Sequence, residues 1–308
     1  MQLHNLEDYR RMMADRVRME AYQRAIQAVC PGKVVCEIGL GLGPLSLMAL
    51  QAGAERVYGI EVDHDALLLA TAVIRQHGYG ESSFIPVEGL STRVTLPEPV
   101  DVILSETLDS TGFGENTATY MEDAKQRFLK PGGVFLPSHV TCYAALASPR
   151  TYLRQLRFWQ RELADIVGVN YEDVVSILRS HSHVLDVEEE DCFSAWQVWR
   201  EMDFDRPATF HETKDIVLDV SRAGTVHGVA SAFEATLSPG VSLRNYPWDP
   251  PTCWKQGFNP FASPMALEVG EAAFVQLVLP SSELIQIEFE LHVTAGPVAA
   301  VREVALTG

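Results

Sequence analysis

Basic residues are scarce in this sequence. The 24 lysines and arginines stand against 41 acidic residues, which gives a formal net charge of −17 at pH 7. Nucleic-acid-binding domains usually carry the opposite balance, so we expect no nucleic-acid partner. An acidic protein attracts cations instead, from small ammonium or guanidinium compounds to basic peptides, although the same charge would also simply aid solubility.

Paired cysteines, an apolar leader and a long apolar run are also missing. The odd set of five cysteines has no Cys-x-x-Cys pair, which argues against a disulfide framework or a zinc ribbon and suits a reducing cytoplasm. No third metal ligand accompanies His181 and His183, so we expect no metal. The N-terminus is charged from its start, and no apolar run approaches the ~18 residues of a membrane span. We therefore expect a cytoplasmic protein without membrane contact.

Helical and extended patterns alternate over the first half of the chain. Apolar residues recur every three or four positions over 6–29, which predicts a helix that ends at a Pro-Gly pair. Further helices are expected over 41–53, 64–78 and 116–133, and buried strands over 33–39, 56–62, 82–89, 100–106 and 134–148. This alternation is typical of an open α/β sheet with parallel strands.

The pattern changes after about residue 140. Residues 151–169 and 170–180 have helical patterns, and most later segments alternate between apolar and polar residues. Such alternation predicts strands over 193–204, 213–220, 224–237, 271–280 and 284–293, as in an antiparallel sandwich or barrel. Without a linker of low complexity between the halves, we expect them to pack closely with a cleft between them.

A glycine-rich turn follows the first predicted strand. Gly39, Gly41 and Gly43 alternate with other residues, and Glu37 stands two positions before the first of them. Glycines let the backbone turn sharply and approach a ligand closely, and the following helix presents free N–H groups. A dinucleotide motif would place glycine or alanine at position 44, where this chain has Pro44.

An acidic residue also ends the second predicted strand. The Glu61 side chain can accept hydrogen bonds from two ribose hydroxyls, as in sites for nucleotide cofactors. Since no pyrophosphate needs to be held at the glycine turn, the pattern favours S-adenosylmethionine, whose product is S-adenosyl-L-homocysteine. The alternative is an ordinary strand-to-helix turn with an incidental glutamate.

The segment DVILSETLDSTGFGE, residues 101–115, begins as a buried strand and ends as a polar loop. Glu106 and Glu115 stand nine positions apart in it. Two carboxylates can hold a planar guanidinium through paired N–H···O bonds, and positioning could then supply most of the rate of methyl transfer. Alternatively, Glu106 would cap a helix or form a salt bridge, and Glu115 would favour the N-terminus of a helix through its dipole.

Five segments occur in the order found in protein arginine methyltransferases, which the chain resembles over nearly its whole length. They are MMADRVRMEAYQRAI (12–26), the glycine-turn segment 34–63, DVILSETLDSTGFGEN (101–116), RFLKPGGVFLPS (127–138) and PTCWKQ (251–256). The resemblance implies an N-terminal helix (1–30), a Rossmann-like S-adenosylmethionine-binding domain (31–137) and a β-barrel acceptor domain (138–308). It also implies a helical dimerisation arm at about 149–185 and a homodimer.

The resemblance further implies roles for individual residues. Glu106 and Glu115 match the glutamate pair that binds the guanidinium in this family. Arg18 matches the arginine that pairs with the carboxylate of S-adenosylmethionine, and Glu61 the residue that binds its ribose. Glu88 stands near the acid that contacts the adenine, although its register differs by a few positions.

The departures from the family pattern surround the acceptor pocket. Cys253, before Trp254, replaces the family histidine that pairs with an aspartate, which Asp15 matches here, and Thr117 replaces a common methionine. A tyrosine-rich N-terminal helix is mostly missing, since only eight residues precede Tyr9. Cysteine cannot make the charge-assisted bond of histidine, so Asp15 would need another partner or stay solvated.

These residues predict an S-adenosylmethionine-dependent arginine N-methyltransferase. The altered acceptor pocket favours free L-arginine or a small guanidino metabolite of a biosynthetic pathway as its substrate. The alternatives are arginine in a peptide or protein, a different nucleophile on the same fold, or a regulatory module that only binds the cofactor.

Overall fold

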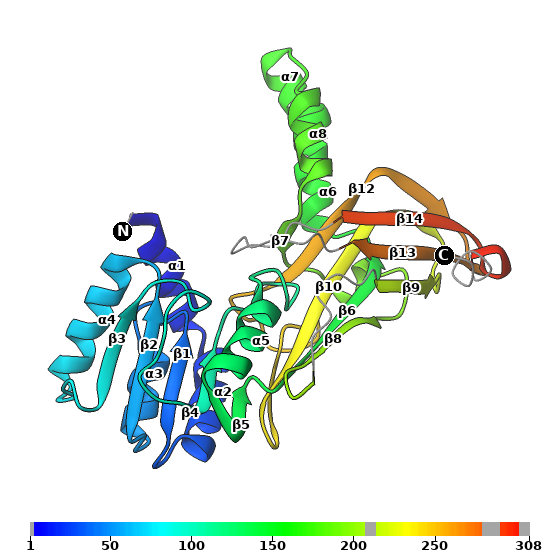
Figure 1. Cartoon of the computed structure of the whole chain (residues 1–308). Helices are drawn as coiled ribbons and strands as arrows, with labels where there is room; N and C mark the ends of the chain where they lie inside the picture. Colours follow the sequence, from blue (N-terminus) through cyan, green and yellow to red (C-terminus); the bar gives the residue numbers. More distant parts are fainter. Residues whose placement is uncertain (1–2, 207–213, 279–289, 302–308) are drawn as a thin grey trace.

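The chain folds into a parallel sheet domain and an antiparallel domain that carries a projecting helical arm (Figure 1). The structure is a computed structural model that describes residues 3–206, 214–278 and 290–301. One cluster of buried apolar side chains runs through both domains, from Ile38 and Leu104 to Phe233 and Leu243. The two domains therefore share a core, which sets the position of the surfaces where they meet.

The first domain is a five-stranded parallel sheet in the order β3-β2-β1-β4-β5. Its strands are β1 Val34–Ile38, β2 Arg56–Glu61, β3 Phe84–Glu88, β4 Val100–Ser105 and β5 Leu129–Leu136. Its helices are α1 Leu3–Ala14, α2 Arg16–Val29, α3 Pro44–Gln51, α4 His64–Gln76 and α5 Thr117–Arg127. All residues of β1 are buried, Glu37 included, as expected for a central parallel strand that is mostly apolar.

Three predicted elements of this half are wrong in their bounds. The helix expected over 6–29 is broken into α1 and α2, because Asp15 leaves the helical conformation and its carboxylate caps α2 at the backbone N–H of Arg18. The strand expected over 134–148 is two strands, since the chain leaves the parallel sheet at Pro137, which has no N–H to donate. Helix α5 ends at Arg127, before the Lys-Pro-Gly-Gly segment that belongs to β5.

The second domain holds two antiparallel sheets. One has the order β7-β12-β10-β6-β8 with β11 beside β10, and the other the order β14-β13-β9. The strands of the larger sheet are β6 His139–Ala147, β7 His183–Leu185, β8 Gln197–Asp203, β10 Gly224–Ser238, β11 Val241–Arg244 and β12 Gln256–Leu267. Those of the smaller are β9 Lys214–Asp219, β13 Glu271–Val278 and β14 Glu290–Pro297. Closure of these sheets into a barrel stays a prediction.

Strands β7, β11 and β12 were not predicted, and the three residues of β7 lie within the range expected for the arm. Strand β12 contains Gly257, Pro260 and Pro264, which interrupt the alternation that marks a strand, and β11 has only four residues. The strand expected over 284–293 lies in β14 only from Glu290 onward, and its first part lies outside the described residues, as does the C-terminus from residue 302.

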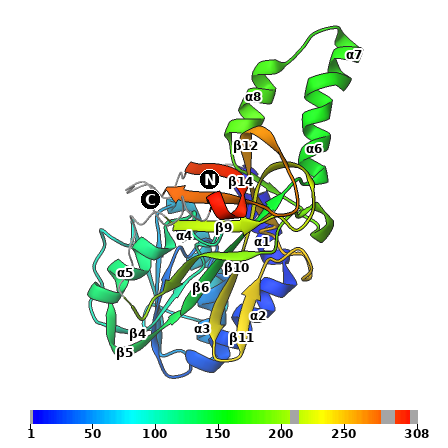
Figure 2. The same ribbon diagram turned by 90° about the vertical axis from the view of Figure 1, so that its right-hand side faces the viewer.

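The arm consists of two antiparallel helical legs. The first runs through α6 Arg150–Arg157, the π-helical segment Phe158–Glu162 and α7 Leu163–Val167, and the second is α8 Glu172–Ser180. Figures 1 and 2 show it extending away from both sheet domains. Its base packs on the larger sheet through Tyr152 and Phe258, whose ring centroids lie 4.8 Å apart. Within the described ranges, no helix combines the length and apolarity that crossing a membrane requires.

Candidate active site

A cavity of about 610 Å³ lies at the carboxyl ends of β1, β2 and β4, where open α/β sheets bind ligands. Helices α1 and α2 and the segment after β11 also line it. It brings together most of the predicted site residues, namely Arg18, Glu37, Gly39, Gly41, Glu61, Glu106, Glu115, Cys253 and Trp254. Asp15, Gly43, Glu88 and Thr117 are not among its lining residues.

The glycine turn needs its glycines for conformation and for space. Gly39, Gly41 and Gly43 have φ angles of 76°, 54° and 78°, in the left-handed region that favours glycine. A Cβ on Gly41 would lie 2.9 Å from the ring of Tyr9, and one on Gly43 would lie 3.1 Å from Cβ of Ala70 in α4. Gly41 therefore leaves space for the Tyr9 ring at the cavity wall, whereas Gly43 allows the turn to pack on α4.

Two glutamates support this turn. The Glu61 carboxylate accepts hydrogen bonds from the backbone N–H groups of Gly41 at 2.7 Å, Val62 at 2.8 Å and Asp63 at 2.9 Å. It is thus fixed at the cavity wall with about one of its four acceptor positions left for a hydroxyl group. Glu37 accepts a hydrogen bond from the Ser46 hydroxyl, and burial raises its pKa to about 8. Much of Glu37 is therefore neutral at pH 7.

Glu106 forms a buried ion pair with Arg18, and the two side chains are only 8% and 6% exposed. Nη1 of Arg18 also donates to the carbonyl of Met12 at 2.9 Å, and its guanidinium lies 5.6 Å from the centroid of Trp254. Burial raises the pKa of Glu106, although the charge of Arg18 lowers it. Burial lowers the pKa of Arg18, but the charge of Glu106, the groups of Tyr22 and Cys253 and the hydrogen bond to Glu106 together outweigh it, and the net shift is upward.

Glu115 reaches the same cavity because Asp109 shapes the intervening loop. Oδ1 of Asp109 accepts hydrogen bonds from the backbone N–H groups of Thr111, Phe113 and Gly114 at 2.9–3.2 Å. Burial raises the pKa of Glu115 to about 8, and the charges of Glu106 and Asp109 add to this effect. The cavity thus holds a pair of carboxyl groups of which one is ion-paired and the other is largely protonated near neutral pH.

Asp109 and Tyr9 are site residues that the sequence interpretation missed. An aspartate before Ser-Thr-Gly is a signal for a turn closed by a side chain, so Asp109 could have been found. Tyr9 lines the cavity beside the glycine turn. Burial and the charges of Glu61 and Asp63 raise its pKa to about 12. Tyr9 lines the cavity because α1 folds back over the glycine turn, and only the structure shows this.

Glu88 and Thr117 are not among the residues that line the cavity. Glu88 pairs with Glu61 in the strand register, but its carboxylate lies 2.9 Å from Nδ1 of His64, and the side chain is 56% exposed. Thr117 is buried, and its hydroxyl donates to the carbonyl of Thr107. Glu88 therefore belongs to the outer surface, and Thr117 holds the loop between the two glutamates.

The segment at Cys253 and Trp254 is tied to both sides of the cavity. Oδ2 of Asp15 accepts a hydrogen bond from the backbone N–H of Cys253 at 2.6 Å. The indole N–H of Trp254 donates to the carbonyl of Leu108 at 2.5 Å. Asp15 therefore does have a hydrogen-bond partner in place of the family histidine. That partner is the backbone N–H of Cys253. Burial raises the pKa of the Cys253 thiol to about 12.

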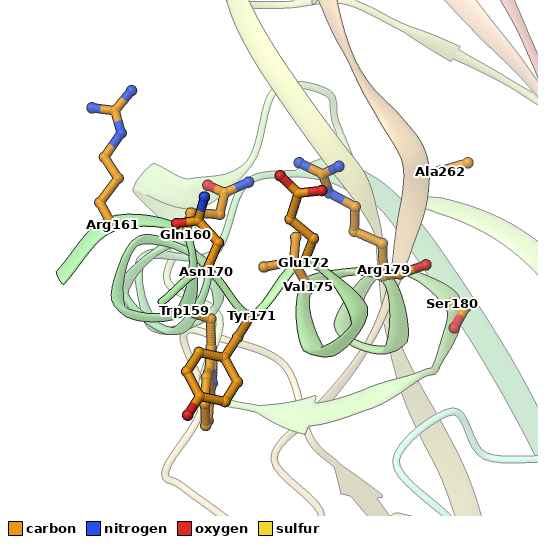
Figure 3. Close-up of a pocket in the computed structure, with 11 residues that line it drawn as sticks. Trp159, Gln160, Arg161, Asn170, Tyr171, Glu172, Val175, Arg179, Ser180 and Ala262 are labelled. Carbon is orange, nitrogen blue, oxygen red and sulfur yellow. The ribbon is translucent and has the colours of Figure 1, made fainter. Parts of the chain in front are cut away.

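A second hollow of about 680 Å³ lies between the two legs of the arm. Figure 3 shows the rings of Trp159 and Tyr171 side by side, and their centroids are 5.8 Å apart. Arg161, Glu172 and Arg179 complete its polar rim. It lacks a carboxylate pair and a glycine turn, so we assign the chemistry to the cavity at the sheet. In the part of the chain that the structure describes, no cluster of three metal-binding side chains occurs.

The parallel sheet, its glycine turn and the appended antiparallel domain define a Rossmann-like methyltransferase. The family described as the arginine methyltransferase oligomerization subdomain matches residues 138–293. The arginine N(omega)-methyltransferase of Streptomyces achromogenes subsp. streptozoticus is 30% identical over 271 residues, which cover 86% of this chain and 74% of that protein. This chain therefore belongs to the protein arginine methyltransferase family.

Two further comparisons agree with this assignment. A probable protein arginine N-methyltransferase 6 of Arabidopsis thaliana is 27% identical over 316 residues, with 88% of this chain and 72% of that protein covered. The PRMT1 enzyme-prozyme heterotetrameric complex of Trypanosoma brucei, solved with AdoHcy, superposes with a TM-score of 0.78 at 20% identity. That alignment covers 93% of this chain and 97% of the other, and shows a shared fold.

The double role of Asp15 leads to a stability prediction. Asp15→Ala removes a helix cap worth about 1 kcal/mol and leaves the N–H of Cys253 without a charged acceptor, which costs about 1–3 kcal/mol more. Asp63→Ala is the matched control, because Asp63 caps α4 at the N–H of Ala66 at 3.0 Å and Asp15 caps α2 at the same distance. Urea unfolding should show the larger loss for Asp15→Ala. Equal losses would mean that the bond to Cys253 adds no stability.

Proposed function

We propose that this protein transfers a methyl group from S-adenosylmethionine to a guanidino nitrogen of arginine, and that free L-arginine or a small guanidino metabolite is the acceptor. The observation that carries the proposal is the position of Glu106 and Glu115 in one cavity with the glycine turn. Membership of the arginine methyltransferase family supports the reaction class.

The residues present fit S-adenosylmethionine. Gly41 itself carries no side chain, although the Tyr9 ring lies against it, Glu61 is fixed beside it with about one acceptor position to spare, and Arg18 offers a buried cation. We assign Glu61 to the ribose hydroxyls and Arg18 to the carboxylate of the cofactor. Glu37 lies at the base of the turn. When bound, the cofactor supplies an electrophilic methyl group on a positively charged sulfur.

The chain itself binds and orients the acceptor. Each carboxylate has about four acceptor positions, so Glu106 can hold a second guanidinium while it keeps its bond to Arg18. Glu115 must lose its proton to form the second half of the pair. Uneven binding by the two carboxylates draws positive charge toward the nitrogens that they contact and leaves electron density on the remaining nitrogen. A strong base is unnecessary, because the methylated product can lose a proton late to a glutamate or to water.

The residues at the rim of the cavity are the reason for proposing a small acceptor. Tyr9, Met12 and Met13 of α1 line it on one side, and Cys253 stands where the family pattern places histidine. The Streptomyces relative is named arginine N(omega)-methyltransferase, whereas the plant relative is named for protein arginine. Arginine in a protein is therefore the alternative acceptor. The two acceptors differ in whether the guanidino group belongs to a small molecule or to a polypeptide.

We also propose a cytoplasmic homodimer. The matched oligomerization subdomain and the exposed apolar residues of the arm support the dimer, since Ile166 is 73% and Ile177 56% exposed. The five cysteines are free, which suits a reducing compartment. Equilibrium sedimentation of the wild-type chain tests the assembly.

The acceptor is tested by mass spectrometry after incubation with methyl-labelled S-adenosylmethionine. Free arginine, an arginine-rich peptide and a lysine peptide are offered in parallel. Labelled methylarginine from free arginine, with little product from either peptide, supports the proposal. Turnover of the arginine peptide alone would assign a protein acceptor. Cofactor binding without turnover of any guanidine would exclude the reaction.

Replacement of Glu106 should separate chemistry from cofactor binding. Glu106→Gln keeps the shape of the side chain but removes the charge that holds the guanidinium, so we expect kcat to fall at least about 10²-fold. Calorimetry should find the affinity for S-adenosyl-L-homocysteine nearly unchanged. Glu88→Gln is the control, since its carboxylate lies outside the cavity, and it should change neither quantity. A parallel loss of cofactor affinity in Glu106→Gln would make Glu106 a structural residue.

The raised pKa of Glu115 predicts how activity depends on pH. The guanidinium of arginine stays charged, so the ionisation of the enzyme decides acceptor binding. Below its pKa of about 8, the ionised fraction of Glu115 grows with pH. With saturating cofactor, kcat/KM should therefore rise by up to tenfold per pH unit toward pH 8 and level off above it. Glu37→Gln should keep the rise. A flat profile from pH 6 to 9 would contradict the assignment.

A further inference from the structure

A third cavity, of about 560 Å³, lies on the antiparallel domain and shares no lining residue with the candidate active site. Four aromatic side chains line it. Tyr143 comes from β6, Trp196 from the segment before β8, and Tyr246 and Trp248 from the turn after β11. The remaining lining residues are Glu189, Cys192, Ser194, Ala195 and Ser221.

The four aromatic rings form a continuous row. Tyr143 and Tyr246 lie edge to face at 5.2 Å, Tyr246 and Trp248 are stacked at 5.1 Å, and Trp248 and Trp196 lie edge to face at 6.1 Å. Trp248 is 52% exposed, which leaves much of its ring open to solvent. The guanidinium carbon of Arg244 lies 5.5 Å from the centroid of Tyr246, so this row already attracts a planar cation.

The row is held rigidly. Asn245 donates from its side chain to the carbonyls of Ser110 at 2.9 Å and Lys255 at 2.6 Å. Its Oδ1 accepts a hydrogen bond from the backbone N–H of Phe233 at 2.6 Å. The segment that carries Tyr246 and Trp248 is therefore anchored at Asn245, directly before Tyr246. A preformed aromatic surface loses little conformational entropy when a ligand binds.

One carboxylate at this cavity has no ion-pair partner within the described residues. Arg150 pairs with Glu188 at 3.2 Å, Glu190 at 3.6 Å and Asp191 at 3.2 Å, but not with Glu189. Arg222, the neighbouring cation, donates to the backbone carbonyls of Glu190 and Cys192 instead. The cavity therefore combines aromatic faces with one uncompensated negative charge, which is complementary to an organic cation.

We propose that this aromatic cavity binds a small alkylated organic cation, of the class of N-methylated guanidinium. Aromatic faces favour cations that carry apolar groups and are weakly hydrated, and Glu189 supplies the counter-charge. A strongly hydrated ammonium loses more hydration on entering such a cavity. The proposal concerns binding alone and does not depend on the reaction assigned to the other cavity.

Because the chain has five tryptophans, a fluorine label on tryptophan reports ligand binding separately at each of them. The full chain is labelled with 5-fluorotryptophan and titrated with methylguanidinium chloride, and ¹⁹F NMR follows the resonances of Trp196 and Trp248. Trp254 reports on the candidate active site in the same spectrum. We expect saturable shifts of Trp196 and Trp248, and at least about tenfold weaker binding of methylurea, which has a similar shape and no charge.

Variants assign the site. Glu189→Gln should weaken binding of methylguanidinium about two- to fivefold, whereas Glu188→Gln, at a carboxylate paired with Arg150, should leave it unchanged. Trp248→Leu should abolish the saturable shift of Trp196 without changing the unfolding midpoint, because the ring is half exposed.

Four outcomes would overturn the proposal. They are a shift that grows linearly without saturation, equal binding of methylurea, a response confined to Trp254, and insensitivity to Glu189→Gln. A short peptide with a methylated arginine that bound more than about tenfold tighter than methylguanidinium would also overturn the assignment to a small ligand.

Discussion

The buried ion pair between Arg18 and Glu106 is the interaction on which the site depends. Glu106 directly follows β4 and is largely buried, and an isolated carboxylate there would be strongly disfavoured. Arg18 makes its burial tolerable and is itself held by the carbonyl of Met12 and the ring of Trp254. One charge pair thus joins the N-terminal helices, the parallel sheet and the antiparallel domain around a single cavity.

Two further carboxyl groups of the cavity, those of Glu37 and Glu115, avoid the cost of a buried charge in a different way. Glu37 and Glu115 have pKa values raised to about 8 by burial. Near neutral pH, they avoid the cost of a buried charge by holding protons. A cationic ligand would remove that cost by supplying the counter-charge. Binding of an organic cation would therefore favour release of the protons of these two groups.

The fold was largely predictable because its signals are local. Continuous apolar strands, the glycine turn and the alternation after residue 140 each follow from residues close in sequence. The break at Asp15 and the change of sheet at Pro137 were not recognised, because each lies inside an apolar pattern that continues across it. Strand β12 was missed because Pro260 and Pro264 obscure its period.

The site was predictable where it follows strand ends, as for Glu61 and Glu106. It was not predictable where long-range packing decides a side chain's direction. Glu88 also ends a strand, yet its side chain turns outward to His64. Tyr9 gives no signal in the sequence, because its role arises only when α1 folds over the glycine turn.

The bond from Asp15 to position 253 is made to main chain, and this changes what evolution can do at that position. A contact that depends on a histidine ring fixes the residue, whereas every amino acid except proline carries a backbone N–H. This bond between the domains can therefore be kept when the side chain at 253 changes. The side chain at 253, which lines the cavity, is not needed for this bond. Substitutions there can change the cavity wall without breaking the bond to Asp15.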